Sequence, residues 1–138
     1  MKKLFFFAIA LSFTGLCSSQ APCSAIAEFC EQNLSANFIS DGQSYRAFLS
    51  VEDVAEFKAT LYGGNTYRIA ACSGTENGNL MFNVLDRERK PMFDSSEHEN
   101  ASYWDFEVEN TFDCIIEAQL NIEKIDSGCA VLLIAFEN

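Results

Sequence analysis

Hydrophobic and polar side chains alternate along most of the chain from Tyr45 onward, which is the period of a β-strand with one buried face. The alternation is regular in residues 54–62, and it returns in residues 66–73 after the turn sequence Gly63-Gly64-Asn65. These two segments predict an antiparallel hairpin. The same pattern predicts further strands at 80–84, 91–93, 103–108, 114–122 and 129–136.

Three of these strands also indicate their place in a sheet. The segment 91–93 begins with Pro91, which cannot donate a backbone hydrogen bond, so it is predicted at an edge. In the segment 103–108, Trp104 and every second residue after it are predicted to face the core. The segment 129–136 is apolar on both faces, which predicts a buried, central strand.

Residues 23–36 follow the period of a helix instead. Ile26, Phe29 and Leu34 recur at helical spacing on one face, and Pro22 just before the run fits a helix start. We therefore expect a mainly β protein: an antiparallel β-sandwich, jelly-roll-like, of seven to eight strands, with one N-terminal helix that covers a face or an open end. Residues 20–138 are predicted to form this single domain.

Residues 1–19 have the order of a secretory signal peptide, with Lys2 and Lys3 followed by an apolar run and then small residues. We expect cleavage after Ser19, with Ala21 as the alternative site, and a secreted or periplasmic location. The apolar run is too short for a stop-transfer helix, and no second apolar stretch of about 20 residues follows. Membrane insertion of the mature protein is therefore not expected.

The chain is acidic, with 20 acidic and 9 basic residues and a formal net charge of −11. Removal of Lys2 and Lys3 with the signal peptide lowers this charge to −13. Phosphate binding needs clustered Lys and Arg, so the charge disfavours nucleic acid and anionic membrane surfaces as partners. The expected partner is a protein or a glycan.

Five cysteines follow the signal peptide: Cys23, Cys30, Cys72, Cys114 and Cys129. This odd number predicts two disulfides and one leftover thiol, or a bond to another chain. Cys23 and Cys30 are separated by about 10.5 Å along a helix, beyond the roughly 7 Å that a disulfide spans, so both are expected to face strand cysteines. We predict a Cys72–Cys129 bridge, with Cys114 bonded to Cys23 or Cys30. The other helix cysteine is predicted to be unpaired or to join a disulfide-linked dimer.

Catalytic residues do not form a recognisable pattern. His98 is the single histidine and is predicted to lie exposed in a loop. The triplet Asp126-Ser127-Gly128 occurs in aspartic proteases, but it lacks their apolar strand and second signature, so a turn is predicted. We therefore expect no enzyme, with a small secreted hydrolase using paired carboxylates as the catalytic alternative.

A polar loop offers oxygen ligands for calcium. Its candidate residues are Asp94, Glu97, Glu99 and Asn100, with Asp105 beside them. Calcium takes about six to eight oxygen ligands, often from such loops, although no EF-hand spacing is present. No other cofactor is expected.

Parts of the strand pattern resemble a known layout, carried by Asn65-Thr66-Tyr67-Arg68-Ile69, by residues 80–86 and by Gly128-Cys129-Ala130-Val131-Leu132-Leu133. Residues 45–136 resemble the pre-peptidase C-terminal domains of bacterial secreted proteins, and also small exported proteins of the Bacteroidetes type. The resemblance implies a jelly-roll-like, non-catalytic module that sometimes binds calcium. The chain departs from that family in its N-terminal helix and in residues 81–84, which lack the acidic side chains of the calcium-associated members.

These observations predict an exported, disulfide-stabilised, non-catalytic binding or accessory module. A calcium-dependent surface or adhesive module is the alternative. The pattern of residues does not specify the ligand.

Overall fold

The computed structural model describes residues 23–138, so the predicted signal peptide at 1–19 lies outside the described residues. One helix and eight strands build the domain, with a short 3-10 helix η1 between the fifth and sixth strands. Their bounds are α1 Cys23–Glu31, β1 Phe38–Ser50, β2 Val54–Leu61, β3 Asn65–Ser73, β4 Leu80–Leu85, β5 Pro91–Asp94, η1 Ser95–His98, β6 Tyr103–Val108, β7 Phe112–Leu120 and β8 Ser127–Glu137. The strand segments predicted from the alternation are confirmed, each within a few residues. The predicted antiparallel hairpin of residues 54–62 and 66–73 is wrong: β2 pairs with β7, whereas β3 pairs with β6 and β8 in the other sheet, so the turn between them crosses from one sheet to the other.

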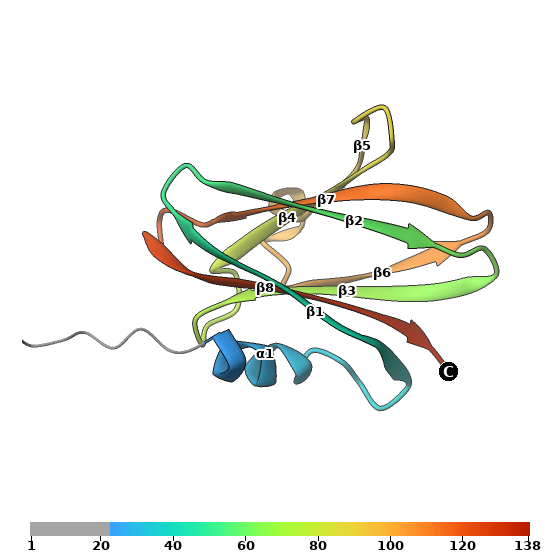
Figure 1. Cartoon of the computed structure of the whole chain (residues 1–138), viewed down its shortest axis with the longest axis horizontal. Helices are drawn as coiled ribbons and strands as arrows, with labels where there is room; N and C mark the ends of the chain where they lie inside the picture. Colours follow the sequence, from blue (N-terminus) through green and yellow to red (C-terminus); the bar gives the residue numbers. More distant parts are fainter. Residues whose placement is uncertain (1–22) are drawn as a thin grey trace, which may run out of the picture.

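The strands form two four-stranded antiparallel sheets: sheet A in the order β1-β8-β3-β6, and sheet B in the order β2-β7-β4-β5 (Figure 1). The first strand pairs with the eighth, the second with the seventh, the third with the sixth and the fourth with the fifth. This nested pairing is the arrangement of a double-sheet jelly roll. It confirms the predicted β-sandwich, and it leaves β6 and β5 as the last strands on the same side of the two sheets.

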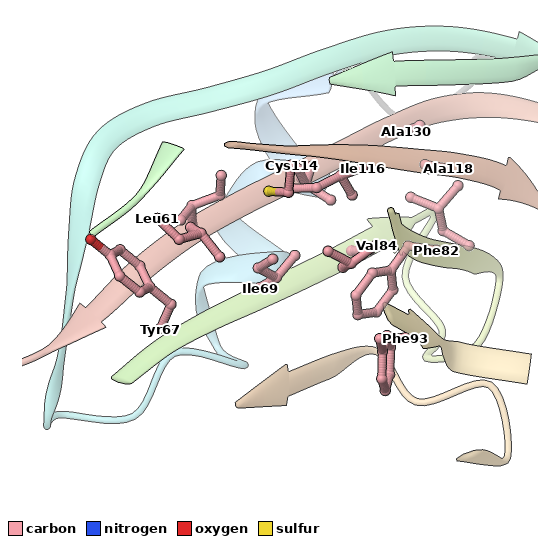
Figure 2. Packing of buried hydrophobic residues seen from close by; sticks show 14 of the residues in the cluster. Leu61, Tyr67, Ile69, Phe82, Val84, Phe93, Cys114, Ile116, Ala118 and Ala130 are labelled. Carbon is pink, nitrogen blue, oxygen red and sulfur yellow. The ribbon is translucent and has the colours of Figure 1, made fainter. Parts of the chain in front are cut away.

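The core lies between the sheets, where every second side chain of the paired strands points inward (Figure 2). Ile69 of β3, Phe82 of β4 and Ile116 of β7 are almost fully buried there. Strand β8 is buried on both faces from Gly128 to Ala135, which confirms the prediction of a central strand.

Helix α1 covers the outer face of sheet A, below β8 and β3 in Figure 1. Its buried residues Ile26, Ala27 and Cys30 pack against Val131 and Leu133 of β8 in a second, smaller hydrophobic cluster. The helix ends at Glu31 instead of the predicted residue 36, because i→i+3 turns follow it and lead directly into β1. Within residues 23–138, no helix is long and apolar enough to cross a membrane.

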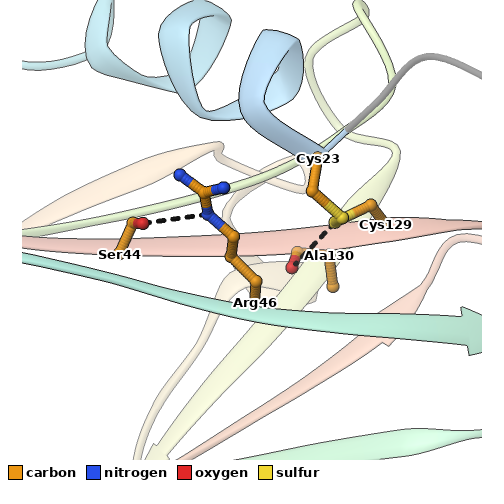
Figure 3. Close-up of a disulfide and its surroundings, with 5 residues drawn as sticks. All are labelled: Cys23, Ser44, Arg46, Cys129 and Ala130. Carbon is orange, nitrogen blue, oxygen red and sulfur yellow. Dashed lines mark hydrogen bonds between the residues drawn. A yellow bond between two sulfur atoms is a disulfide. The ribbon is translucent and has the colours of Figure 1, made fainter.

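Both disulfides join this helix to sheet A, Cys23 to Cys129 and Cys30 to Cys72, with Cα–Cα distances of 5.5 and 5.7 Å (Figure 3 shows the first). The expectation that the helix cysteines bond to strand cysteines is confirmed. The predicted Cys72–Cys129 bridge is wrong, because both of these side chains point outward toward α1 and each meets a helix cysteine. The prediction for Cys114 is also wrong: it points into the core and is the free thiol of the described residues. Two disulfides are typical of proteins that fold outside the reducing cytoplasm.

Cys114 is expected to resist alkylation in the native protein, because its side chain is 2% exposed and burial raises its pKa to about 11. Intact-mass measurement after iodoacetamide treatment at pH 8 checks this. One adduct is expected only after unfolding without reductant, and rapid native labelling would show that Cys114 is accessible.

The same buried thiol is expected to make stability fall as the pH rises from about 9 to 11. The unfolded chain releases the thiol proton near its ordinary pKa of about 8.5, whereas the folded chain retains it to about 11. Urea unfolding across this range checks the slope. The free energy of unfolding of the Cys114→Ala variant should decline less steeply with pH. The decline that remains comes from Tyr45, whose pKa is also raised by burial. An unchanged slope would contradict the assignment to Cys114.

Candidate interaction surface

The side of the sandwich formed by β6 and η1 brings together most of the polar and aromatic residues that the sequence singled out. Strand β6 is the last strand of sheet A and pairs with β3. Side chains of Tyr103 and Asp105 lie on the outer face of the sheet, and those of Trp104 and Phe106 on the inner face, because they alternate along the strand.

Arg68 of β3 fixes the side chains that β6 presents on the outer face of sheet A. It lies directly opposite Asp105 in the strand register, and its guanidinium donates from Nε to Oδ1 at 2.7 Å and from Nη2 to Oδ2 at 2.8 Å. Its third nitrogen, Nη1, donates to the main-chain oxygen of Asn33 at 3.0 Å. The hydrogen bonds to Asp105 raise the pKa of Arg68 further above its ordinary value. This planar guanidinium, which we call the Arg68 fork, therefore ties β3, β6 and the segment after α1 together.

The same guanidinium lies against two aromatic rings. Its central carbon is 4.3 Å from the ring centre of Phe38 and 4.3 Å from that of Tyr103. The Arg68 side chain is 12% exposed, so these contacts are largely shielded from water. Tyr103, 41% exposed, is thus held in place while part of its ring stays open to a partner.

A second aromatic cluster closes the gap between the edges of the two sheets. Trp104 lies 5.1 Å from Phe93 of β5 and 4.3 Å from His98 of η1, measured between ring centres. His98 also stacks on Phe93, with ring centres 5.2 Å apart and planes 6° from parallel. The prediction of an exposed histidine is confirmed, but its ring is packed on these aromatic residues.

Trp104 departs from its predicted place in the core. Its side chain has the inward orientation that the alternation gave, yet it is 37% exposed. The reason is topological: β6 ends its sheet, so no further strand covers the indole. Exposed, ordered Trp and Tyr side chains are enriched at protein interfaces.

A hollow of about 500 Å³ lies at the start of β6. Tyr103, Trp104 and Asp105 line it together with Ala101 and Ser102 of the preceding loop, and Asn33 and Asn77 complete its wall. Its wall therefore combines aromatic rings with amide, hydroxyl and carboxylate oxygens, which can accept hydrogen bonds from a partner.

Exposed carboxylates flank these aromatic side chains along the chain. They are Glu97 and Glu99 around η1, and Asp105, Glu107 and Glu109 along and after β6. We name the group formed by Glu97, Glu99, Tyr103, Trp104, Asp105 and Glu107 the β6-edge surface. It attracts a cationic partner and repels an anionic one.

The structure does not assemble the predicted calcium ligands. Asp94 caps η1 by accepting from the main-chain nitrogen of Ser96 at 2.8 Å, and Arg68 occupies both carboxylate oxygens of Asp105. Glu99 and Asn100 take the left-handed conformation, with φ of 58° and 53°, where the loop reverses direction. Among residues 23–138, no three acidic, histidine or cysteine side chains converge as a metal site.

Sequence reasoning missed Arg68, the residue that organises this surface. Arg68 and Asp105 are separated by 37 positions. Their polar positions in two alternating strands were visible, but the pairing of β3 with β6 was not. Only the strand register brings the two side chains together.

Comparison with known proteins gives a likeness of fold. No family model and no curated protein matches the chain. The crystal structure of PliG from Aeromonas hydrophila, a periplasmic lysozyme inhibitor of g-type lysozyme, superimposes with a TM-score of 0.52 and 10% sequence identity. The match covers 69% of this chain and 85% of the PliG chain. It supports the β-sandwich, whereas the resemblance to pre-peptidase C-terminal domains stays a prediction.

Proposed function

We propose that this protein is an exported, non-catalytic binding module whose partner is a protein with a cationic surface. The observation that carries the proposal is the β6-edge surface, where an ordered tyrosine and an exposed tryptophan are flanked by carboxylates. Aromatic anchors within a polar rim are the usual composition of a protein-binding site.

The rigidity of this surface supports the same function. Arg68 fixes Tyr103 and Asp105 through its fork and ring contacts, while Phe93 and His98 fix Trp104. Side chains that are ordered before binding lose less conformational entropy when a partner arrives. The surface is therefore suited to binding without rearrangement.

The partner class that we propose is a lytic enzyme outside the cytoplasm, with the protein acting as its inhibitor. The fold likeness to a protein described as an inhibitor of g-type lysozyme supports this choice, as do the two disulfides. The acidic charge of the chain supports it further, because long-range attraction speeds association with a basic enzyme.

The test is inhibition of a purified g-type lysozyme in a cell-wall turbidity assay. We expect stoichiometric inhibition by the unchanged protein, and at least about a tenfold weaker effect from Trp104→Ala or from Glu97→Lys/Glu107→Lys. Glu52→Lys/Glu88→Lys, at exposed acids in the β1–β2 and β4–β5 turns, makes the same change of charge and is the control that should inhibit normally. Thermal melts show whether each variant is folded. No inhibition and no binding by the unchanged protein would reject the lysozyme class.

A further inference from the structure

We propose that the partner adds an extended, basic segment to the free edge of β6 as a further strand of sheet A. The inference rests on the proposed function and states how the same surface takes its partner. It follows from the backbone of β6, from the order of its side chains and from its charge.

The backbone of β6 has one unused edge. The main-chain oxygen of Ser102 accepts from the amide of Ala71 on β3, and that of Val108 accepts from the amide of Gly64 beside β3. The backbone groups of the even-numbered residues of β6 therefore face β3. Because backbone groups alternate in direction along an antiparallel strand, Tyr103, Asp105 and Glu107 turn their N–H and C=O groups away from β3. These three residues offer a ladder for an incoming strand.

The side chains of the same three residues share the outer face of the sheet. In an added antiparallel strand, each residue opposite them directs its side chain to that face, and such residues recur every second position, about 7 Å apart. The carboxylate of Asp105 is already paired with Arg68, so the exposed acids Glu107 and Glu109 are the ones that favour basic residues at alternate positions of the partner. The hollow beside Tyr103 has room for one of these side chains.

The intervening partner residues face the other side of the added strand, where Trp104 lies exposed. Apolar side chains suit those positions because the indole is packed on Phe93 and His98 and leaves an apolar surface. The segment that fits best thus alternates basic and apolar residues.

Charge excludes a second copy of this chain as the occupant. Pairing two β6 edges would place Asp105 and Glu107 of one molecule beside the same acidic residues of the other. Like charges in directly opposing positions destabilise strand pairs. Acidic residues along a free edge thus discourage self-association while attracting a basic strand.

The experiment uses an eight-residue peptide of alternating lysine and valine, titrated into the full protein. Trp104 is the single tryptophan of the chain, so its fluorescence reports occupancy of the edge directly. Two N-methylated forms of the peptide separate strand pairing from charge attraction. Methylation at lysines removes N–H groups that face β6, whereas methylation at valines removes N–H groups that face solvent.

We expect the lysine-methylated peptide to bind roughly tenfold more weakly than the parent, and the valine-methylated peptide to bind within about twofold of it. Glu107→Lys/Glu109→Lys should weaken parent binding, and Glu52→Lys/Glu88→Lys, with the same change of charge, should not. Equal binding of all three peptides would overturn strand addition and leave only charge recognition. Inhibition of the lysozyme without any peptide binding would overturn this inference while the proposed function stands.

Discussion

Replacing Cys30 and Cys72 together by serine is expected to destabilise the protein by about 3–4 kcal/mol. Their disulfide joins residues separated by 42 positions, and a cross-link of that length removes much of the freedom of the unfolded chain. It also fastens α1 to the outer face of sheet A, where Cys30 is fully buried. Urea unfolding, monitored by circular dichroism, measures the change in the free energy of unfolding.

The effect of this double variant should extend to binding. The segment that follows Cys30 carries Asn33, whose main-chain oxygen accepts from Arg68 and whose amide nitrogen donates to the Cys72 sulfur at 3.4 Å. Loosening it leaves the Arg68 fork less constrained, so inhibition of the lysozyme should weaken as well. Cys114→Ala is the control for loss of a cysteine and should keep full inhibition. A double variant as stable as the unchanged protein would contradict the role assigned to this disulfide.

Replacing Arg68 by methionine is expected to cost about 2–3 kcal/mol of stability and to weaken partner binding at least about tenfold. Methionine keeps the apolar stem but removes the fork that satisfies both oxygens of Asp105. It also withdraws the donor to Asn33 and the cation between Phe38 and Tyr103. Asp105 and Tyr103 then lose their fixed positions.

Arg68→Lys separates charge from geometry in this prediction. Lysine retains the positive charge but lacks a planar fork, so it should recover only part of the stability and part of the binding. Calorimetric melts and lysozyme titrations of both variants provide the comparison. Full binding by Arg68→Met would show that the surface does not depend on the fork.

The strand pattern of the sequence predicted most of the fold, because one-sided burial repeats every two residues along each strand. The central position of β8 followed from its side chains alone. The hairpin predicted for β2 and β3 did not form, because the two strands belong to different sheets, and alternation does not show which strands pair. The start of β1 was also missed: Phe38 begins the strand, but a register shift between Ser40 and Ser44 and the polar sequence around Gly42 interrupt its alternation. A bulge of this kind removes the period on which prediction depends.

The candidate surface was predicted only in composition. The acidic residues, His98 and Trp104 were visible in the sequence, but their arrangement depends on which strands end the sheets. Trp104 was predicted in the core because alternation does not distinguish an edge strand from an interior one. Likewise, the disulfide partners depend on where α1 crosses sheet A. Such long-range placements have no local signal in a single sequence.

Amide hydrogen–deuterium exchange of the full protein, measured with and without the g-type lysozyme, shows whether the partner binds along the free edge of β6. We expect the enzyme to slow exchange at Tyr103, Asp105 and Glu107, whose amides face the free edge of β6. Exchange of the amides of sheet B should stay unchanged. Protection at sheet B with none along β6, or no protection at all, would show that the enzyme does not bind at this edge.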